Sequence, residues 1–141
     1  MKNIVILTIA LLLLAGCSTK EFTPDIDIDI STKSVQLHSE SLSNEFVTIT
    51  ITRKDSNETP IEILALFPEN VESLYVTDAT GNQLDSLEFR LSQGKGSKDT
   101  KQFKIWGTSN QARKAIYDVP IEFIYQNNII YSRTLEATVT R

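Results

Sequence analysis

Residues 46–52 read Phe-Val-Thr-Ile-Thr-Ile-Thr, which alternates apolar and polar side chains without a break. In an extended chain, Val47, Ile49 and Ile51 share one face and the threonines share the other. β-Branched residues are enriched in strands, and period-two alternation is typical of a strand with one buried face. This stretch therefore predicts a strand that contributes one side to a core.

The same kind of pattern continues on both sides of this stretch. Further strands are predicted at residues 25–30, 35–37, 61–67, 71–77, 84–91 and 103–107. Residues 84–91 also carry leucines at helical spacing, and we favour a strand there because the neighbouring segments are strands. Polar turns are predicted at residues 54–59 and 78–82, with Gly81 available for a positive φ, and a loop at residues 92–100.

The last third of the chain predicts a long hairpin. Odd-numbered apolar residues share a face on both arms, so odd positions must pair with odd positions. This favours a three-residue loop at 126–128, which places Tyr125 opposite Ile129. The same register places Phe123 opposite Tyr131.

Three residues of the hairpin have special roles. Asn128 is expected to adopt the left-handed conformation that such a loop needs. Pro120 has no backbone N–H to donate, so it predicts a bulge or a local edge. Arg133 falls among the inward positions and is expected near an edge of the sheet.

Seven to nine short strands, polar turns and no long helix predict an all-β fold, an antiparallel β-sandwich. The pattern resembles the immunoglobulin-like accessory domains of bacterial and archaeal envelope proteins. The resemblance rests on the strand at 46–52, the turn Leu91-Ser92-Gln93-Gly94 before a later strand, and the closing hairpin that begins at Tyr117. It spans most of residues 30–140 and implies a fold. The cysteines and core tryptophan of antibody domains are missing, so it implies no ligand.

The charge of the chain narrows the range of partners. Its 141 residues include 14 Lys+Arg and 18 Asp+Glu, a net charge of −4. Lys2 is the only charge in the first 16 residues, so the remainder has 13 basic and 18 acidic residues, or −5. An acidic domain repels phosphate backbones, so we expect no nucleic-acid partner. The single cysteine is Cys17, so packing without disulfides must hold the domain together.

The N-terminus carries the most specific motif. Lys2 is followed by an apolar run at residues 4–15, which is shorter than the roughly 20 residues of a spanning helix and fits a signal peptide. The sequence Leu14-Ala15-Gly16-Cys17 resembles the lipobox of prokaryotic lipoprotein precursors. The resemblance implies cleavage between Gly16 and Cys17, a diacylglycerol on the Cys17 thiol, and often acylation of its amine by a fatty acid such as palmitate.

This resemblance implies a domain organisation and a location. Residues 1–16 are a signal peptide, residues 17–24 a lipidated tether ending at Pro24, and residues 25–141 the sandwich. Two or more acyl chains, at about 0.8 kcal/mol per buried CH₂, give a stable membrane anchor. We expect an extracytoplasmic, lipid-anchored protein. Ser18, where Asp commonly retains lipoproteins at the inner membrane, resembles the outer-membrane pattern if the source is Gram-negative.

Asp25, Asp27 and Asp29 are candidate metal ligands. Alternate carboxylates on a strand suggest calcium, but side chains two apart lie roughly 6–7 Å from one another, and the glycine and distal glutamate of an EF-hand loop are missing. A charged edge strand is the interpretation we favour. His38, the only histidine, falls on the solvated face, and no G-x-S-x-G motif accompanies it. We therefore expect neither an enzyme nor a cofactor.

The remaining candidates concern binding. The basic residues cluster late in the chain, at Lys95, Lys98, Lys101, Lys104, Arg113 and Lys114. They suggest either a docking site for an acidic partner or lipid headgroups, or a solvated loop. Trp106, on the opposite face from Phe103 and Ile105, is a candidate binding residue together with Lys101 and Lys104. The alternative is that Trp106 covers the end of the sandwich. Asn57 begins a glycosylation sequon.

Two functions follow as hypotheses. We prefer a non-catalytic lipoprotein whose sandwich binds or scaffolds another envelope protein. The alternative is a surface lipoprotein that binds a small ligand or a glycan through Trp106 and the tyrosines. Tyr117, Tyr125 and Tyr131 fall on the predicted core face, which counts against the alternative.

Overall fold

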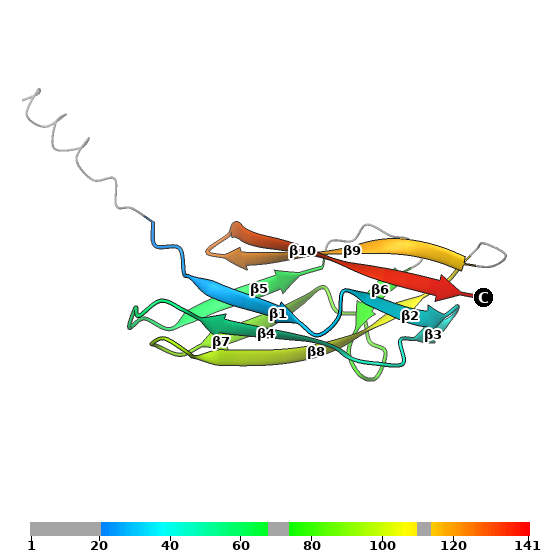
Figure 1. The fold of residues 1–141 in the computed structure, drawn as a ribbon, viewed down its shortest axis with the longest axis horizontal. Helices are drawn as coiled ribbons and strands as arrows, with labels where there is room; N and C mark the ends of the chain where they lie inside the picture. Colours follow the sequence, from blue (N-terminus) through cyan, green and yellow to red (C-terminus); the bar gives the residue numbers. More distant parts are fainter. Residues whose placement is uncertain (1–20, 68–73, 110–113) are drawn as a thin grey trace, which may run out of the picture.

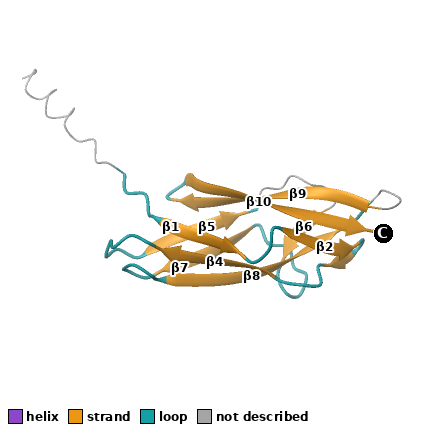
Figure 2. Ribbon diagram, viewed as in Figure 1, coloured by secondary structure: helices purple, strands orange, loops and turns teal. Residues whose placement is uncertain are grey.

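The computed structural model describes residues 21–67, 74–109 and 114–141. Within these ranges the chain is entirely β, as Figures 1 and 2 show. The strands are β1 (Ile26–Ile30), β2 (Ser34–His38), β3 (Ser41–Leu42), β4 (Val47–Arg53), β5 (Ile61–Leu66), β6 (Leu74–Thr77), β7 (Ser86–Leu91), β8 (Lys98–Gly107), β9 (Lys114–Tyr125) and β10 (Asn128–Thr140). The described part of the chain contains no helix long and apolar enough to cross a bilayer.

The strands form two sheets that pack face to face (Figure 1). One sheet has the order β1-β4-β8-β3, with β6 also paired to β8, and the other has the order β2-β10-β9-β5-β7. The all-β sandwich predicted from the sequence is confirmed. One expectation was wrong, because β2 runs parallel to β10. We call the sheet that contains β1 the first sheet and the one that contains β2 the second. Between β1 and β2 the chain crosses from the first sheet to the second without reversing direction, so β2 lies parallel to β10.

The core lies between the inward faces of the two sheets. Val47, Ile49 and Ile51 are fully buried, as the alternation predicts. Phe103 of β8 and Phe123 of β9 meet them from the two sheets and are equally buried. Each of these strands except the two-residue β3 thus contributes alternate side chains to one continuous apolar cluster. The outward side chains of the same strands form the outer faces of the two sheets.

The closing hairpin has a tighter turn than predicted. Tyr125 pairs with Asn128, and Gln126 and Asn127 are the two turn residues, both with positive φ. Asn128 is therefore not the left-handed residue. The ladder then shifts between Ile129 and Tyr131. This bulge restores the predicted pairing of Phe123 with Tyr131, because the inward faces of both arms must meet the same core.

Some strand boundaries also differ from those expected. The strand β8 begins at Lys98, so the loop before it is shorter than residues 92–100, because residues 98–100 pair with the end of β4. Residues 86–91 form a strand, so the strand predicted at residues 84–91 is confirmed over the helix that the leucine spacing also allowed. Of the strand predicted at 71–77, residues 74–77 are described. Gly81 has φ 92°, as its turn requires.

Pro120 lies beyond the described part of the ladder between β5 and β9. It pairs with Thr134 of β10, while the described ladder from β5 reaches β9 only at residues 122–124. Arg133 lies where β10 has left its ladder with β2, which covers residues 136–140. The edge position expected for Arg133 is confirmed, because β10 extends beyond the shorter β2 that flanks it.

Candidate binding surface

The outer face of the first sheet carries an aromatic stack. The rings of Trp106 on β8 and Tyr75 on β6 lie 4.9 Å apart between centroids and within 10° of parallel. They are direct partners in the β6–β8 ladder, and Leu42 of β3 pairs with Trp106 on its other side. Trp106 therefore lies between two neighbours on adjacent strands. Tyr75 is 37% exposed, so the stack is open to solvent at its β6 side.

A cation–π pair continues this surface along the sheet. The ammonium group of Lys104 lies 4.8 Å from the centroid of the Phe46 ring, which is 40% exposed. Lys104 and Trp106 are two residues apart on β8, so their side chains leave the same face. We call Leu42, Phe46, Tyr75, Lys104 and Trp106 the aromatic surface. It brings together side chains from three strands and from the segment before β4.

Elsewhere on the same face the side chains are polar. Thr50 and Thr100 share a hydrogen bond of 3.1 Å between their hydroxyl groups, and Gln102 donates one of 3.2 Å to Thr48. This is the ordinary hydrophilic pattern of a solvated sheet face. The aromatic surface interrupts that pattern at one end of β8. Because these outward aromatic residues lie outside the core, the aromatic surface is the candidate binding surface of the described residues.

Lys101 does not belong to this surface, although the sequence grouped it with Trp106 and Lys104. Its register position, opposite Ile49, places it on the inward side of β8, where it forms an ion pair of 3.6 Å with Asp99. Asp99 also accepts a hydrogen bond of 2.9 Å from the backbone N–H of Arg90 on β7. Asp99 and Lys101 therefore lie between β7 and β8. Because side chains alternate along β8, Lys101 lies on the opposite face from Lys104 and Trp106.

The three aspartates at and just before β1, Asp25, Asp27 and Asp29, do not converge on a metal site. Asp27 lies opposite Thr52 and forms an exposed ion pair of 3.7 Å with Lys54. The backbone N–H of Asp25 donates to the Asp55 carboxylate. Within the described ranges, no three His, Cys, Asp or Glu side chains are grouped as ligands. The strand β1 pairs with β4 alone and is an edge strand, as expected.

The other sequence candidates are placed as follows. His38 is exposed, with Nδ1 3.3 Å from the Thr140 hydroxyl. Asn57 lies in the β4–β5 loop, where its side chain accepts a hydrogen bond from the Thr59 backbone. Gly16 and Cys17 lie outside the described residues. Tyr117, Tyr125 and Tyr131 are half-buried and pack against the core, as predicted.

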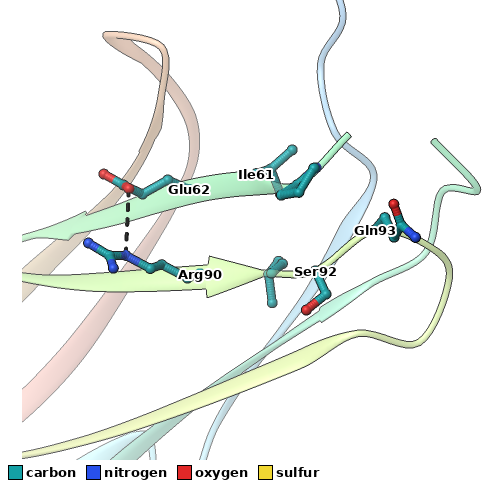
Figure 3. Close-up of a pocket in the computed structure, with 7 residues that line it drawn as sticks. Ile61, Glu62, Arg90, Ser92 and Gln93 are labelled. Atoms are coloured by element: carbon teal, nitrogen blue, oxygen red, sulfur yellow. Dashed lines mark ion pairs between the residues drawn. The ribbon is translucent and has the colours of Figure 1, made fainter. Parts of the chain in front are cut away.

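A shallow groove of about 510 Å³ lies at one end of β5 and β7 (Figure 3). Glu62 and Arg90 line it as an exposed ion pair of 3.8 Å, together with Ser92 and Gln93 from the following loop. The two charges neutralise each other, so the groove presents mixed polar groups and no concentrated charge. It belongs to the second sheet and is separate from the aromatic surface.

Arg53 is a buried charge that the sequence reasoning missed. Its Nε donates to Asp55 at 2.9 Å, and its Nη1 donates to the carbonyl oxygens of Thr59 at 2.6 Å and Ser92 at 3.1 Å. The side chain is fully buried. Burial alone would raise the pKa of Asp55, but hydrogen bonds from the Asn57 backbone and the Arg53 guanidinium lower it overall. Arg53 follows the inward alternation of β4, and that spacing was the available signal.

Asp78 organises the turn after β6. Its carboxylate accepts hydrogen bonds from the hydroxyl and backbone N–H of Thr80 at 2.7 and 2.8 Å. It also accepts from the side chain and backbone of Asn82 at 2.9 and 3.0 Å. The hydrogen bond from the Thr80 hydroxyl, followed by those from Asn82, holds the pKa of Asp78 well below its usual range. This turn lies beside the aromatic surface, since Gly81 is close to Leu42.

The two packed sheets, one containing β1, β3, β4, β6 and β8 and the other β2, β5, β7, β9 and β10, form an immunoglobulin-like β-sandwich. Among solved structures, the chain is similar to the CARDB domain of the PF1109 protein from Pyrococcus furiosus, which was solved in complex with di-metal ions. The TM-score is 0.52 at 11% identity, over 86% of this chain and 96% of that domain. At this identity the likeness shows the fold alone.

Two further solved structures are similar to the chain at lower scores. The periplasmic chaperone SfaE has a TM-score of 0.44 at 12% identity, over 80% of this chain and 56% of that chain. The PapD-like domain 7 of human CEP192 has a TM-score of 0.41 at 9% identity, over 87% of this chain and 89% of that chain. No model of a known protein family matches the chain. No curated protein is significantly similar to it in sequence.

Proposed function

We propose that this chain is a lipid-anchored, extracytoplasmic lipoprotein whose non-catalytic sandwich binds another envelope protein through the aromatic surface. The anchor rests on the resemblance of residues 14–17 to a lipobox and on the apolar run before them. The binding role rests on one observation, the solvent-open stack of Tyr75 on Trp106 beside the pair of Lys104 and Phe46.

The composition of the surface favours a protein partner. Tryptophan and tyrosine are enriched among the residues that dominate the energy of protein interfaces, because they bury a large area with few rotatable bonds. Lys104 sits at the edge of this apolar area and adds a cation, which suits a partner with an acidic or aromatic group at that position.

The geometry is less suited to a sugar. A glycan site presents an open aromatic ring face on which a pyranose ring can lie. Here the faces of Tyr75 and Trp106 cover each other at 4.9 Å, so each ring has already lost one face to its neighbour. Tyr117, Tyr125 and Tyr131 are committed to the core side. Glycan binding therefore remains the second hypothesis.

Photo-cross-linking in cells tests the binding role. Phe46 is replaced by benzoylphenylalanine, which keeps an aromatic ring at a 40% exposed position. The control carries the same group at Ile116, which is 55% exposed on the second sheet. We expect one discrete protein adduct from position 46, lost in the Trp106→Ala variant, and none from position 116. Equal adducts at both positions, or none at position 46, would contradict the proposal.

The anchor has its own test. Mass spectrometry of the protein from its native host should show Cys17 as the N-terminus with a diacylglycerol adduct, and Cys17→Ser should abolish processing. An intact leader with a free thiol would overturn this part of the proposal. Separation of inner and outer membranes then tests the Ser18 pattern, with the outer membrane as the expected location in a Gram-negative host.

A further inference from the structure

The tip of the β9–β10 hairpin is uncharged and partly apolar. Residues 123–132 read Phe-Ile-Tyr-Gln-Asn-Asn-Ile-Ile-Tyr-Ser, without an acidic or basic side chain between Glu122 and Arg133. It is the longest uncharged run after Cys17, in a chain of which 23% is charged. Ile129 beside the turn is 57% exposed. A single exposed isoleucine is ordinary, so what matters is whether Ile129 is part of a larger apolar area.

Ile129 belongs to an apolar row on the outer face of the second sheet. It pairs directly with Ile124 of β9, which in turn pairs with Leu64 of β5. Both are half-buried; Leu64 lies between the fully buried Ile63 and Ala65, and Ile124 follows the fully buried Phe123. The row therefore faces away from the core and reaches the hairpin tip at its most exposed member, Ile129.

The N-terminal segment is attached at this same end of the domain. The Phe22 ring packs edge-on against the Tyr125 ring, with centroids 6.4 Å apart, and Pro24 is buried. In Figure 1 the segment before β1 leaves the sandwich beside the hairpin tip, and the C-terminus lies at the opposite end. Cys17 is five residues before Phe22, so the Cα atoms of the two residues can be no more than about 18 Å apart along an extended chain.

From these three observations we infer that the hairpin tip rests in the headgroup region of the membrane that holds the anchor. This rests on the proposed lipidation of Cys17. An acyl chain in the bilayer confines Phe22, and hence the tip, to within a short tether of the surface. Isoleucine transfers favourably from water into the acyl boundary, and tyrosines such as Tyr125 and Tyr131 are typical of membrane interfaces. The absence of charge removes the main cost of insertion.

This orientation also has a consequence for the aromatic surface. Trp106 lies at the end of β8 that pairs with Leu42 and Leu74, away from the end where Lys98 meets Thr52 next to the tether. A tip seated on the bilayer thus directs the aromatic surface away from the membrane and toward a partner. The inference deepens the proposed function because it fixes the direction in which the binding surface is presented.

The test uses the full-length protein, purified with its lipid and reconstituted into vesicles of phosphatidylethanolamine and phosphatidylglycerol. Because Cys17 is the only cysteine and its thiol is alkylated by the lipid, an introduced cysteine is a unique labelling site. An environment-sensitive fluorophore is placed at Asn128→Cys in the tip. The control label is at Arg141→Cys, exposed at the opposite end (Figure 1). Quenchers carried by the lipids report contact with the bilayer, and iodide reports contact with water.

We expect the label at position 128 to be quenched by the lipid-borne quencher and shielded from iodide, and the label at 141 to show the reverse. Ile129→Ser should lower the ratio of molecules with an inserted tip to molecules with a solvent-exposed tip about fivefold. This change corresponds to roughly half of the free energy of transferring an isoleucine side chain out of water. Ile116→Ser is the matched control, since Ile116 is 55% exposed on the same hairpin but away from the tip. It should leave the ratio unchanged.

Three outcomes would overturn the inference. A label at 128 that stays accessible to iodide in the acylated protein shows that the tip stands off the membrane. A label that is shielded from iodide but not quenched by lipid shows that a second protein copy covers the tip. If mass spectrometry finds Cys17 unmodified, the proposed anchor fails first and the inference fails with it, so the two failures are distinguished.

Discussion

Trp106 stacks on Tyr75, with ring centroids 4.9 Å apart and 10° between the ring planes. The two residues are 31 positions apart in the chain, and the β6–β8 ladder places them side by side. Trp106 is the only tryptophan, so its fluorescence reports on the aromatic surface without interference from elsewhere. This makes the surface accessible to direct measurement.

Tyr75→Ala should expose Trp106. Loss of the ring removes an aromatic pair worth about 1 kcal/mol and opens one indole face to water. We expect a red-shifted emission, stronger quenching by iodide and a slightly lower melting temperature. Tyr131→Ala, on the other sheet, is the control and should leave the emission unchanged. Unaltered quenching in Tyr75→Ala would show that the stack does not persist in solution.

Arg53→Ala should be strongly destabilising. It removes a fully buried guanidinium, leaves the carbonyl oxygens of Thr59 and Ser92 without their Arg53 donor, and leaves the Asp55 carboxylate with backbone donors but no cationic partner. Breaking a buried, hydrogen-bonded charge pair costs about 3–5 kcal/mol. Urea denaturation measures the change in the free energy of unfolding. Arg90→Ala is the control, because the Arg90 side chain is 77% exposed and its ion pairs should contribute less than about 1 kcal/mol. Equal effects would contradict this account of Arg53.

Acid should destabilise the domain partly through Asp78. Its pKa is lowered in the folded protein by hydrogen bonds from Thr80 and Asn82, relative to an ordinary value of 3.8. The resulting stabilisation is present above that ordinary value and is lost as the pH falls through the folded pKa. Asp55 acts in the same direction. We expect the melting temperature to fall between pH 5 and pH 2 more steeply in the wild type than in Asp78→Asn. Parallel curves would show that Asp78 makes no contribution.

The turn of the closing hairpin should accept a stabilising substitution. Gln126 and Asn127 have φ values of 47° and 65°, which suit a two-residue turn of asparagine and glycine. The double change Gln126→Asn and Asn127→Gly should raise the free energy of unfolding by about 0.5–1 kcal/mol. Gly94→Ala provides the opposite case, since φ is 90° and no atom lies within 4 Å of the added carbon. It should lower stability by about 1 kcal/mol through the backbone alone. A destabilised double variant would contradict the turn assignment.

Much of the fold was predictable because side-chain alternation is a local property. The faces of Val47, Ile49 and Ile51 follow from residues 46–52 alone, and the pairing of Phe123 with Tyr131 follows from matching the inward faces of two neighbouring arms. The turn itself was not predictable at the same level. A two-residue turn followed by a bulge preserves the same inward pairing as a three-residue loop, so the hydrophobic pattern does not distinguish them.

The amino-acid sequence by itself determined that the chain is all-β, which faces of its strands turn inward, and that Trp106 and Lys104 leave β8 on the same side. Tertiary structure alone decided that Tyr75 and Phe46 join them, that Lys101 pairs with Asp99 beside β7, and that Phe22 meets the hairpin at Tyr125. The physical reason is the range of the interactions. Alternation acts between residues two apart, whereas the neighbours of a side chain are set by which strands pair and which sheets pack together.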